Sequence, residues 1–214
     1  MKKIMFSDEF LLTRAVIEGR KTQTRRIMKG KPLFPSDEIE SAGVLGDEVQ
    51  IIANGGESLI TMKLPFRVGE VVAVAQSYCA IADELENCNN ATCAAHYEKN
   101  VQKASEYISW MEHPGFNNKL FVAADRMIHR IRITNVRVER LQDISDECCL
   151  KEGIIEGLCE GKDNQYRVCY YVPNDTHTFF KPREAFARLI NNVSRKDVWK
   201  ENPYVFVYDF ELVK

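Results

Sequence analysis

The apolar residues of this chain fall in short, separated runs, and the first run follows a helical period. The segment DEFLLTRAVIEG comes directly after Ser7 and predicts a helix with Ser7 as its N-cap and acidic residues in its first turn. Gly19 marks the expected end of this helix. The basic tract GRKTQTRR therefore begins where the helix ends. The apolar positions of the helix form one stripe: Phe10, Leu11, Ala15 and Val16, with Ile17 beside them.

Several later runs have the length and the alternation of β-strands. The runs DEVQIIA and ESLITMKL predict a hairpin that turns at Asn54 to Gly56. A turn at Val68 to Glu70 precedes VVAVAQSY, whose apolar residues occupy both faces, so we expect this strand to be buried on both sides. Residues 30–46 contain several Gly and Pro residues and are predicted to be a loop.

The second half of the chain combines two long strands with two helices. IRITNVRVERL predicts a strand whose apolar residues change face near Thr134 and Asn135, which favours a bulge or a bend there. Ser145 is a good N-cap for a short helix that ends at Gly153. REAFARLINNV predicts another helix, and YVFVYDFELV predicts a terminal strand.

The order of these elements indicates an α+β protein. The strands are short and evenly spaced, without the regular alternation of a parallel sheet, which favours a small, partly open β-barrel with peripheral helices. Residues 80–118 are rich in small and polar side chains, with a helix expected from Ala94 to Met111, and we interpret them as an insertion. The whole chain, residues 1–214, is expected to form a single domain.

The composition indicates a folded protein without membrane segments. The chain has 214 residues, of which 45% are hydrophobic and 28% charged, so it can bury a core. No apolar run approaches about 18 residues, and the apolar part of the N-terminus is too short for a signal peptide. We therefore expect a cytoplasmic protein with no membrane partner.

The seven cysteines are an odd number in a chain that is large enough to fold without disulfides. We expect them to be reduced thiols. Cys88, Cys93 and His96, with Cys79 upstream, have a spacing that departs from the common structural zinc patterns. We interpret them as incidental residues of the inserted segment and predict no metal and no cofactor. A metal assay on the purified protein would test this prediction.

Positive charge is concentrated near the N-terminus. The formal net charge is −2, yet residues 14–31 contain seven cations and one acid, a charge of +6, so the remainder carries −8. The helix dipole favours Lys and Arg after a helix C-terminus and accounts for one or two of these cations. It does not account for Thr22, Gln23 and Thr24 among them, which can hydrogen-bond bases or phosphates.

A second basic set follows the long strand and the turn before it. Its side chains alternate along the strand, and Asp125, Glu139 and Asp143 are near enough in sequence to pair with them. We therefore interpret this set as a solvated face. Its members are Arg126, His129, Arg130, Arg132, Arg137 and Arg140.

Four segments together resemble one known family. They are GRKTQTRR after a short N-terminal helix, VGEVVAVAQSY, ITNVRVERLQDISDECCLKEGI and the tail NPYVFVYDFE, and they lie within residues 7–213. In these segments the chain is similar to the ASCH domain of bacteria and phages, named for homology to the activating signal cointegrator 1. The resemblance implies a β-barrel similar to the PUA fold, an RNA-binding architecture, with insertions at residues 80–118 and 155–181.

The resemblance also implies a cleft around the basic tract. The family pattern G-x-K-x-x-x-x-R fits Gly19, Lys21 and Arg26. One bacterial branch hydrolyses the acetyl amide of N4-acetylcytidine, and its functional Lys, Thr and Glu fall by pattern on Lys21, Thr24 and Glu152. The residues expected to bind RNA or a modified nucleoside or nucleotide are Gly19, Arg20, Lys21, Arg25 and Arg26, with Tyr78 to stack a base.

Hydrolysis by this trio would require a particular backbone conformation. A Thr hydroxyl needs a nearby base, and Lys21 serves as one only if its pKa is depressed. In an extended strand, residues 21 and 24 point to opposite faces, whereas in a helical turn positions i and i+3 share a side. The hypothesis therefore requires non-extended backbone between Gly19 and Thr24.

Three functions and a structural alternative remain open. The first is binding of RNA or of a single modified nucleoside or nucleotide, because an acidic total argues against broad duplex binding. The second is deacylation of N4-acetylcytidine-like nucleosides. The third is a protein–protein adaptor, which predicts a large exposed apolar patch on residues 80–118. In the structural alternative, Thr24 is an ordinary strand residue and Glu152 forms a salt bridge to Lys21 or Arg26.

Overall fold

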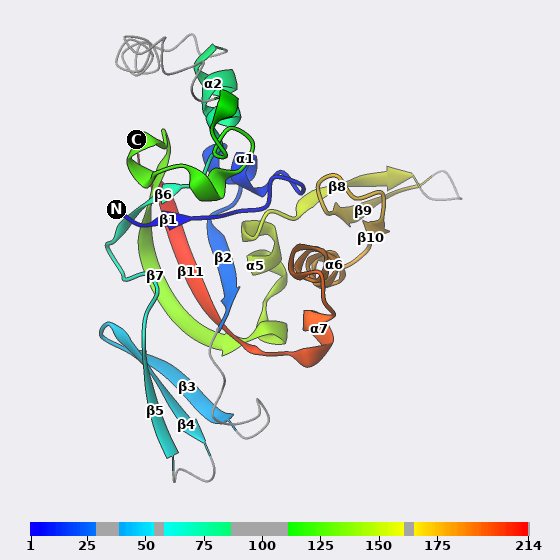
Figure 1. Cartoon of the computed structure of the whole chain (residues 1–214). Helices are drawn as coiled ribbons and strands as arrows, with labels where there is room; N and C mark the ends of the chain where they lie inside the picture. Colours follow the sequence, from blue (N-terminus) through cyan, green and yellow to red (C-terminus); the bar gives the residue numbers. More distant parts are fainter. Residues whose placement is uncertain (29–38, 54–57, 87–110, 161–164, 214) are drawn as a thin grey trace. The chain divides into compact units, whose positions relative to one another are not determined.

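The computed structural model of the chain describes residues 1–28, 39–53, 58–86, 111–160 and 165–213 (Figure 1). In these residues the protein is mixed α+β, with three sheets and few helices, and no sheet closes on itself into a barrel. Among the helices of these ranges, none has the length and the apolar composition needed to cross a membrane. The chain divides into two compact units. The first consists of Met1–Phe6, Val71–Ile131 and Val213–Lys214, and the second consists of Ser7–Glu70 and Arg132–Leu212.

The first unit contains a parallel strand pair and a helix. Strand β1 (Lys3–Ile4) pairs with β6 (Val71–Val74), and α2 (Tyr78–Glu86) follows. Val72, Ala73 and Val74 are fully buried, which confirms the predicted burial of this strand on both faces. Two short 3₁₀ helices, Lys119–Phe121 and Ala124–Arg126, complete the described part of this unit.

Some predictions about the first unit fall on residues outside the described ranges. Most of the helix expected from Ala94 to Met111 belongs to residues 87–110, which are not described. Cys88, Cys93 and His96 lie there too, as does most of the segment on which the adaptor hypothesis expects an apolar patch.

The second unit is organised around an antiparallel sheet. Strand β2 (Gln23–Ile27) pairs with β11 (Tyr204–Val213), and β11 is followed in the sheet by β7 (Arg130–Arg140) (Figure 1). The terminal strand predicted from the sequence has the observed bounds of β11. In β7, Ile131, Ile133 and Val136 are buried, so the apolar face does change between residues 133 and 136.

Four α-helices and a 3₁₀ helix (Leu141–Asp143) belong to the described part of this unit. Ser145 caps α5 (Asp146–Lys151) by accepting a hydrogen bond from the backbone N–H of Cys148, as the sequence predicts. The helix predicted from REAFARLINNV is α6 (Pro182–Ser194), which contacts α5 and α7 (Val198–Glu201). Helix α1 (Leu12–Ile17) begins later than predicted, because Leu11 has a left-handed conformation with φ 51° and takes the N-cap position expected for Ser7.

The two remaining sheets each have three antiparallel strands. Strands β4 (Glu48–Ala53) and β5 (Ser58–Lys63) pair as predicted, and the expected turn at Asn54 to Gly56 lies outside the described residues. Strand β3 (Ile39–Leu45) pairs with β4, so the prediction of a loop throughout residues 30–46 is wrong for this part. The order of the other sheet is β10 (Thr178–Phe179), β9 (Tyr166–Tyr171) and β8 (Ile155–Glu160), which lie within the expected insertion at residues 155–181.

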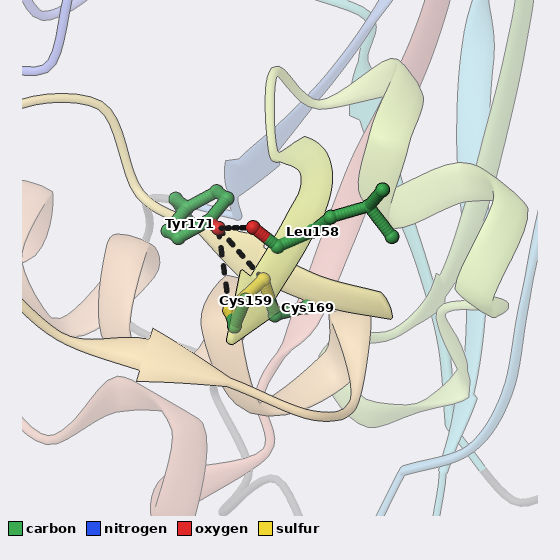
Figure 2. Close-up of a disulfide and its surroundings, with 4 residues drawn as sticks. All are labelled: Leu158, Cys159, Cys169 and Tyr171. Carbon is green, nitrogen blue, oxygen red and sulfur yellow. Dashed lines mark hydrogen bonds between the residues drawn. A yellow bond between two sulfur atoms is a disulfide. The ribbon is translucent and has the colours of Figure 1, made fainter. Parts of the chain in front are cut away.

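A disulfide joins Cys159 of β8 to Cys169 of β9, with Cα atoms 6.0 Å apart. The prediction that all seven cysteines are reduced is therefore wrong for this pair. Cys169 pairs with Gly157 in the β8–β9 register, and Cys159, two residues along, projects from the same face of the hairpin. The Tyr171 hydroxyl lies against both sulfur atoms and donates to the Leu158 carbonyl (Figure 2). The sequence does not reveal this pairing because it depends on the strand register.

Candidate functional site

Backbone hydrogen bonds attach the basic tract to three elements of the second unit: helix α1, the C-terminal end of α5 and strand β11. Gly19 has a φ of +75°, a left-handed value that allows the chain to turn sharply after α1. The N–H of Lys21 then donates to Ala15 O, and the N–H of Thr22 donates to Lys151 O at the end of α5. From Gln23 the chain pairs with β11, so the rest of the tract lies in the sheet.

The tract presents different side chains on the two faces of β2. Because side chains alternate in a strand, Gln23 and Arg25 lie on one face and Thr24 on the other. Lys21 and Arg25 both contact Glu152, so Lys21 is on the face of Arg25. Thr24 is paired with Tyr208 in the ladder and lies on the opposite face from this contact.

The centre of the candidate site is a buried ion cluster. Lys21 Nζ donates to Glu152 Oε2 at 2.6 Å and to the Glu152 backbone carbonyl at 2.7 Å. Arg25 donates to the other oxygen, Glu152 Oε1, at 3.1 Å. The exposed fractions are 2% for Lys21, 4% for Glu152 and 5% for Arg25. Glu152 therefore receives a cation on each carboxylate oxygen, away from solvent.

Gly153 allows the end of α5 to bring Glu152 to Lys21. Its φ is +102°, and a Cβ at this position would lie 3.0 Å from a methyl carbon of Leu12 and 3.7 Å from the Lys21 side chain. Only a residue without a side chain fits this close approach without displacing its neighbours. The Gly that the sequence marks as the end of a helix thus also positions the carboxylate.

The cluster continues from Arg25 towards the surface. Arg25 donates through Nε and a terminal nitrogen to Glu139 Oε1, and Arg137 donates to Glu139 Oε2 at 3.1 Å. Arg137 also donates to Asp209 at 2.7 Å. The Gln23 amide donates to Asp209, and the Gln23 oxygen accepts from Arg25. The network is therefore continuous from Lys21 to Arg137 and Asp209.

Burial in this network decreases from one end to the other. The side chains of Lys21 and Glu152 are 1% and 5% exposed, whereas those of Asp209 and Arg137 are 29% and 34% exposed. Helix α6 covers the buried part, since the Phe186 ring centroid is 5.8 Å from the Arg25 guanidinium. A ligand would therefore meet Arg137, Glu139 and Asp209 first.

Burial also changes the proton affinity of Lys21. Removal from water lowers the pKa of Lys21, and the neighbouring Arg25 and Arg26 lower it further, while Glu152 raises it. The net effect is a pKa below its ordinary value of 10.5. The sequence alone left the balance between burial and Glu152 open.

The other residues predicted for the site have varied positions. Arg20 is exposed and forms an ion pair with Glu18 at 2.6 Å. Arg26 is half-buried on the Thr24 face of β2. Tyr78 belongs to the first unit, where its ring packs edge-on against His113 at 5.5 Å between centroids.

The sequence did not assign four members of the network to the site: Gln23, Arg137, Glu139 and Asp209. Gln23 was noted only as a possible partner of bases or phosphates, and Arg137 was interpreted as part of a solvated face. Alternation from Lys21 to Arg25 would have placed Gln23 on the same face, had the tract been treated as extended. Glu139 was expected to pair with neighbouring arginines, which it does with Arg137, but the sequence has no signal that connects it to Arg25.

Comparison with protein-family models, curated proteins and solved structures found no match for this chain. An assignment of function therefore depends on the chemistry of the site and on the resemblance in the sequence.

Proposed function

We propose that the ion cluster of Lys21, Arg25, Glu139 and Glu152 is part of a site that binds an unpaired RNA base or a modified nucleoside or nucleotide. The observation that supports this most is the burial of Lys21 and Glu152 as an ion pair that continues to partly exposed polar groups. The PUA-like barrel implied by the resemblance remains a prediction that accompanies this proposal.

The composition of the cluster favours a base over a chain of phosphates. Three cations, Lys21, Arg25 and Arg137, are matched by three carboxylates, those of Glu139, Glu152 and Asp209. A phosphate clamp needs an excess of positive charge, which this set lacks. The edge of a nucleobase presents both donors and acceptors, so a balanced set of both kinds is suited to it.

The energetics of the cluster also support a functional role. Burying an ion costs several kcal/mol, and a buried ion pair is often no more stable than apolar residues of the same volume. A shifted lysine pKa beside a carboxylate is typical of functional sites. Fold stability alone therefore gives little reason for an ion pair at this position.

The test uses two arginines of the same strand. Arg137→Gln removes a partly exposed group of the network, and Arg132→Gln is its matched control, because Arg132 also lies on β7 and also pairs with a carboxylate of β11, Glu211. Calorimetry with N4-acetylcytidine, cytidine and a short unpaired RNA should detect binding by the unmodified protein. We expect Arg137→Gln to weaken binding about tenfold, the loss of one charge-assisted hydrogen bond.

The control variant shows whether a loss of affinity is specific to Arg137. Arg132→Gln should change the affinity less than about twofold. Absence of binding to all three probes at low salt, or an equal loss in both variants, would contradict the proposed site.

Hydrolysis of N4-acetylcytidine is a second candidate, favoured by the lowered pKa of Lys21 beside Glu152. A neutral lysine can act as a base. The position of Thr24 on the opposite face of β2 argues against its role as the nucleophile, so we place binding first. Release of cytidine from N4-acetylcytidine is the assay. If the unmodified protein releases cytidine and both Lys21→Ala and Thr24→Ala lose this activity, the result would support the catalytic trio. Hydrolysis would then replace binding as the proposed function.

A further inference from the structure

A polar pocket lies in the second unit, at residues that the proposed site does not use. Its volume is about 750 Å³, which is within the range of small-molecule sites. It is formed by the segment between β9 and β10 and by the C-terminal part of α6 with the residues that follow. The residues that matter below are Asp175, His177, Arg188, Asn192, Arg195 and Lys196.

Asp175 is the fixed centre of this pocket. Its side chain is 5% exposed, and its carboxylate accepts hydrogen bonds from Arg188 Nε at 2.8 Å and from Asn192 Nδ2 at 3.1 Å. The backbone N–H and the ring Nδ1 of His177 donate to its other oxygen at 2.9 and 2.6 Å. Burial alone would raise the pKa of Asp175, but these hydrogen bonds hold it well below its ordinary value of 3.8. Asp175 is therefore a satisfied anion that needs no further ligand.

The same carboxylate orients two cationic or potentially cationic groups. Because Nδ1 of His177 donates to Asp175, Nε2 is the ring nitrogen available to a ligand. The ring of His177 also stacks on Phe179, with centroids 6.5 Å apart and an angle of 27°. Arg188 uses Nε on Asp175, and its side chain is 43% exposed. Both groups are thus held in place before any ligand arrives.

Two further cations of the pocket have no partners. Within the residues that the structure describes, the side chains of Arg195 and Lys196 form no hydrogen bond or ion pair. Asp197, in contrast, already accepts a hydrogen bond from Asn191 at 2.9 Å. Glu9, the third carboxylate of the lining, is exposed. Arg195 and Lys196 are therefore the cations of this pocket that remain available to an anionic ligand.

The dipole of α6 explains only part of this arrangement. Arg195 is the C-cap of α6 and Lys196 follows it, so the dipole favours these two cations. It does not account for the rest of the pocket. The dipole also gives no reason for a histidine and an arginine that share one buried carboxylate.

We propose that this pocket binds the phosphate group of a small phosphorylated molecule, a phosphate monoester, through Arg188, Arg195, Lys196 and Nε2 of His177. A doubly charged phosphate has several acceptor oxygens and suits a site with this number of donors. Unlike the ion cluster around Lys21, this pocket has cations without carboxylate partners, so its ligand differs in charge from a nucleobase.

The experiment follows the histidine signals of the full chain by NMR during titration with ribose 5-phosphate, inorganic phosphate and ribose. The chain has four histidines, and the signal that disappears in His177→Gln identifies His177. We expect ribose 5-phosphate to shift that signal in a saturable way at about millimolar concentrations or below. Inorganic phosphate should do so more weakly, and ribose should leave it unchanged.

Matched charge variants separate a site from general attraction. Arg195→Gln with Lys196→Gln should weaken ribose 5-phosphate binding about tenfold or more. Lys181→Gln with Lys200→Gln removes the same charge from exposed positions of the same unit and should change affinity less than about twofold. Thermal melts check that each variant is folded. An absent or unsaturable shift, a shift with ribose, or equal weakening in both pairs would overturn the proposal. Lys21→Ala should leave this binding intact, which separates it from the proposed nucleoside site.

Discussion

At the scale of single residues, Lys21 shows how position in the fold changes chemistry. In sequence it is one of seven cations in residues 14–31, and only the family resemblance distinguishes it from Arg20 beside it. In the structure Arg20 is solvated and Lys21 is buried against Glu152. Exposed ion pairs contribute little, whereas a buried one affects both stability and proton affinity.

The lowered pKa of Lys21 predicts how stability depends on pH. Between the lowered pKa and 10.5 the unfolded chain binds a proton that the folded protein has released, so stability rises with pH in that window. We expect the free energy of unfolding of the unmodified protein, minus that of Lys21→Met, to increase as pH approaches 10.5. The slope is at most about 1.4 kcal/mol per pH unit. Urea unfolding at several alkaline pH values measures it, and a difference that stays constant or falls would contradict the burial effect.

Gly153 predicts a stability effect that its sequence position alone does not explain. Gly153→Ala places a Cβ at a φ of +102° and 3.0 Å from Leu12, so we expect a loss of about 1–3 kcal/mol in the free energy of unfolding. Gly43→Ala is the control, because a Cβ there meets nothing within 4 Å and its φ is not in the left-handed range. Urea denaturation compares the two. Equal effects would show that the close contact at Gly153 is unimportant.

At the scale of elements, local sequence signals were sufficient to predict the helices and strands whose tertiary packing favours the same conformation. Strands β6 and β11 and helices α5 and α6 were found from apolar runs, a capping serine and helical period. Helix α1 and strand β3 differed from prediction. Leu11 has a left-handed conformation that few leucines adopt, and β3 is defined by its pairing with β4. Neither feature has a local sequence signal.

The disulfide of the β8–β9 hairpin predicts a local loss of stability on its removal. Cys159→Ser with Cys169→Ser opens a link between residues separated by 10 positions, and we expect a loss of about 2–3 kcal/mol. Amide hydrogen exchange should become faster in β8 and β9 and remain unchanged in β2 and β11. Cys79→Ser, which changes a free cysteine of the first unit, is the control. Mass spectrometry of unreduced peptides should detect the link itself, and its absence would contradict the pairing.

At the scale of the whole molecule, charge distribution limits how the protein meets RNA. The chain carries −2, and Arg20, Lys21 and Arg25 of the basic tract are each paired with a carboxylate. Within this tract, few cations are therefore available to displace counterions from phosphates. Glu139 and Glu152 offset Lys21 and Arg25, two of the seven cations of residues 14–31, while Lys29 and Lys31 lie outside the described residues.

This neutralisation predicts a weak salt dependence of RNA binding. For single strands the slope of log K against log salt is about −0.7 per phosphate contacted. We expect a slope no steeper than about −2 for a short unpaired RNA, which corresponds to roughly three phosphates or fewer. Filter binding across a salt series measures it. A slope steeper than about −4 would indicate an extended cationic groove in place of a site for one base.

The sequence by itself determined the local features: most strands and helices, the caps at Ser145 and Gly153, and the basic tract as the place to look for a site. These depend on interactions between residues a few positions apart, which a single sequence displays directly. Tertiary structure alone decided that Lys21 lies against Glu152, 131 positions away, that Thr24 lies on the opposite face, and that Cys159 bonds Cys169. Those outcomes depend on strand register and on which side chains lose water together, and both are properties of the folded chain.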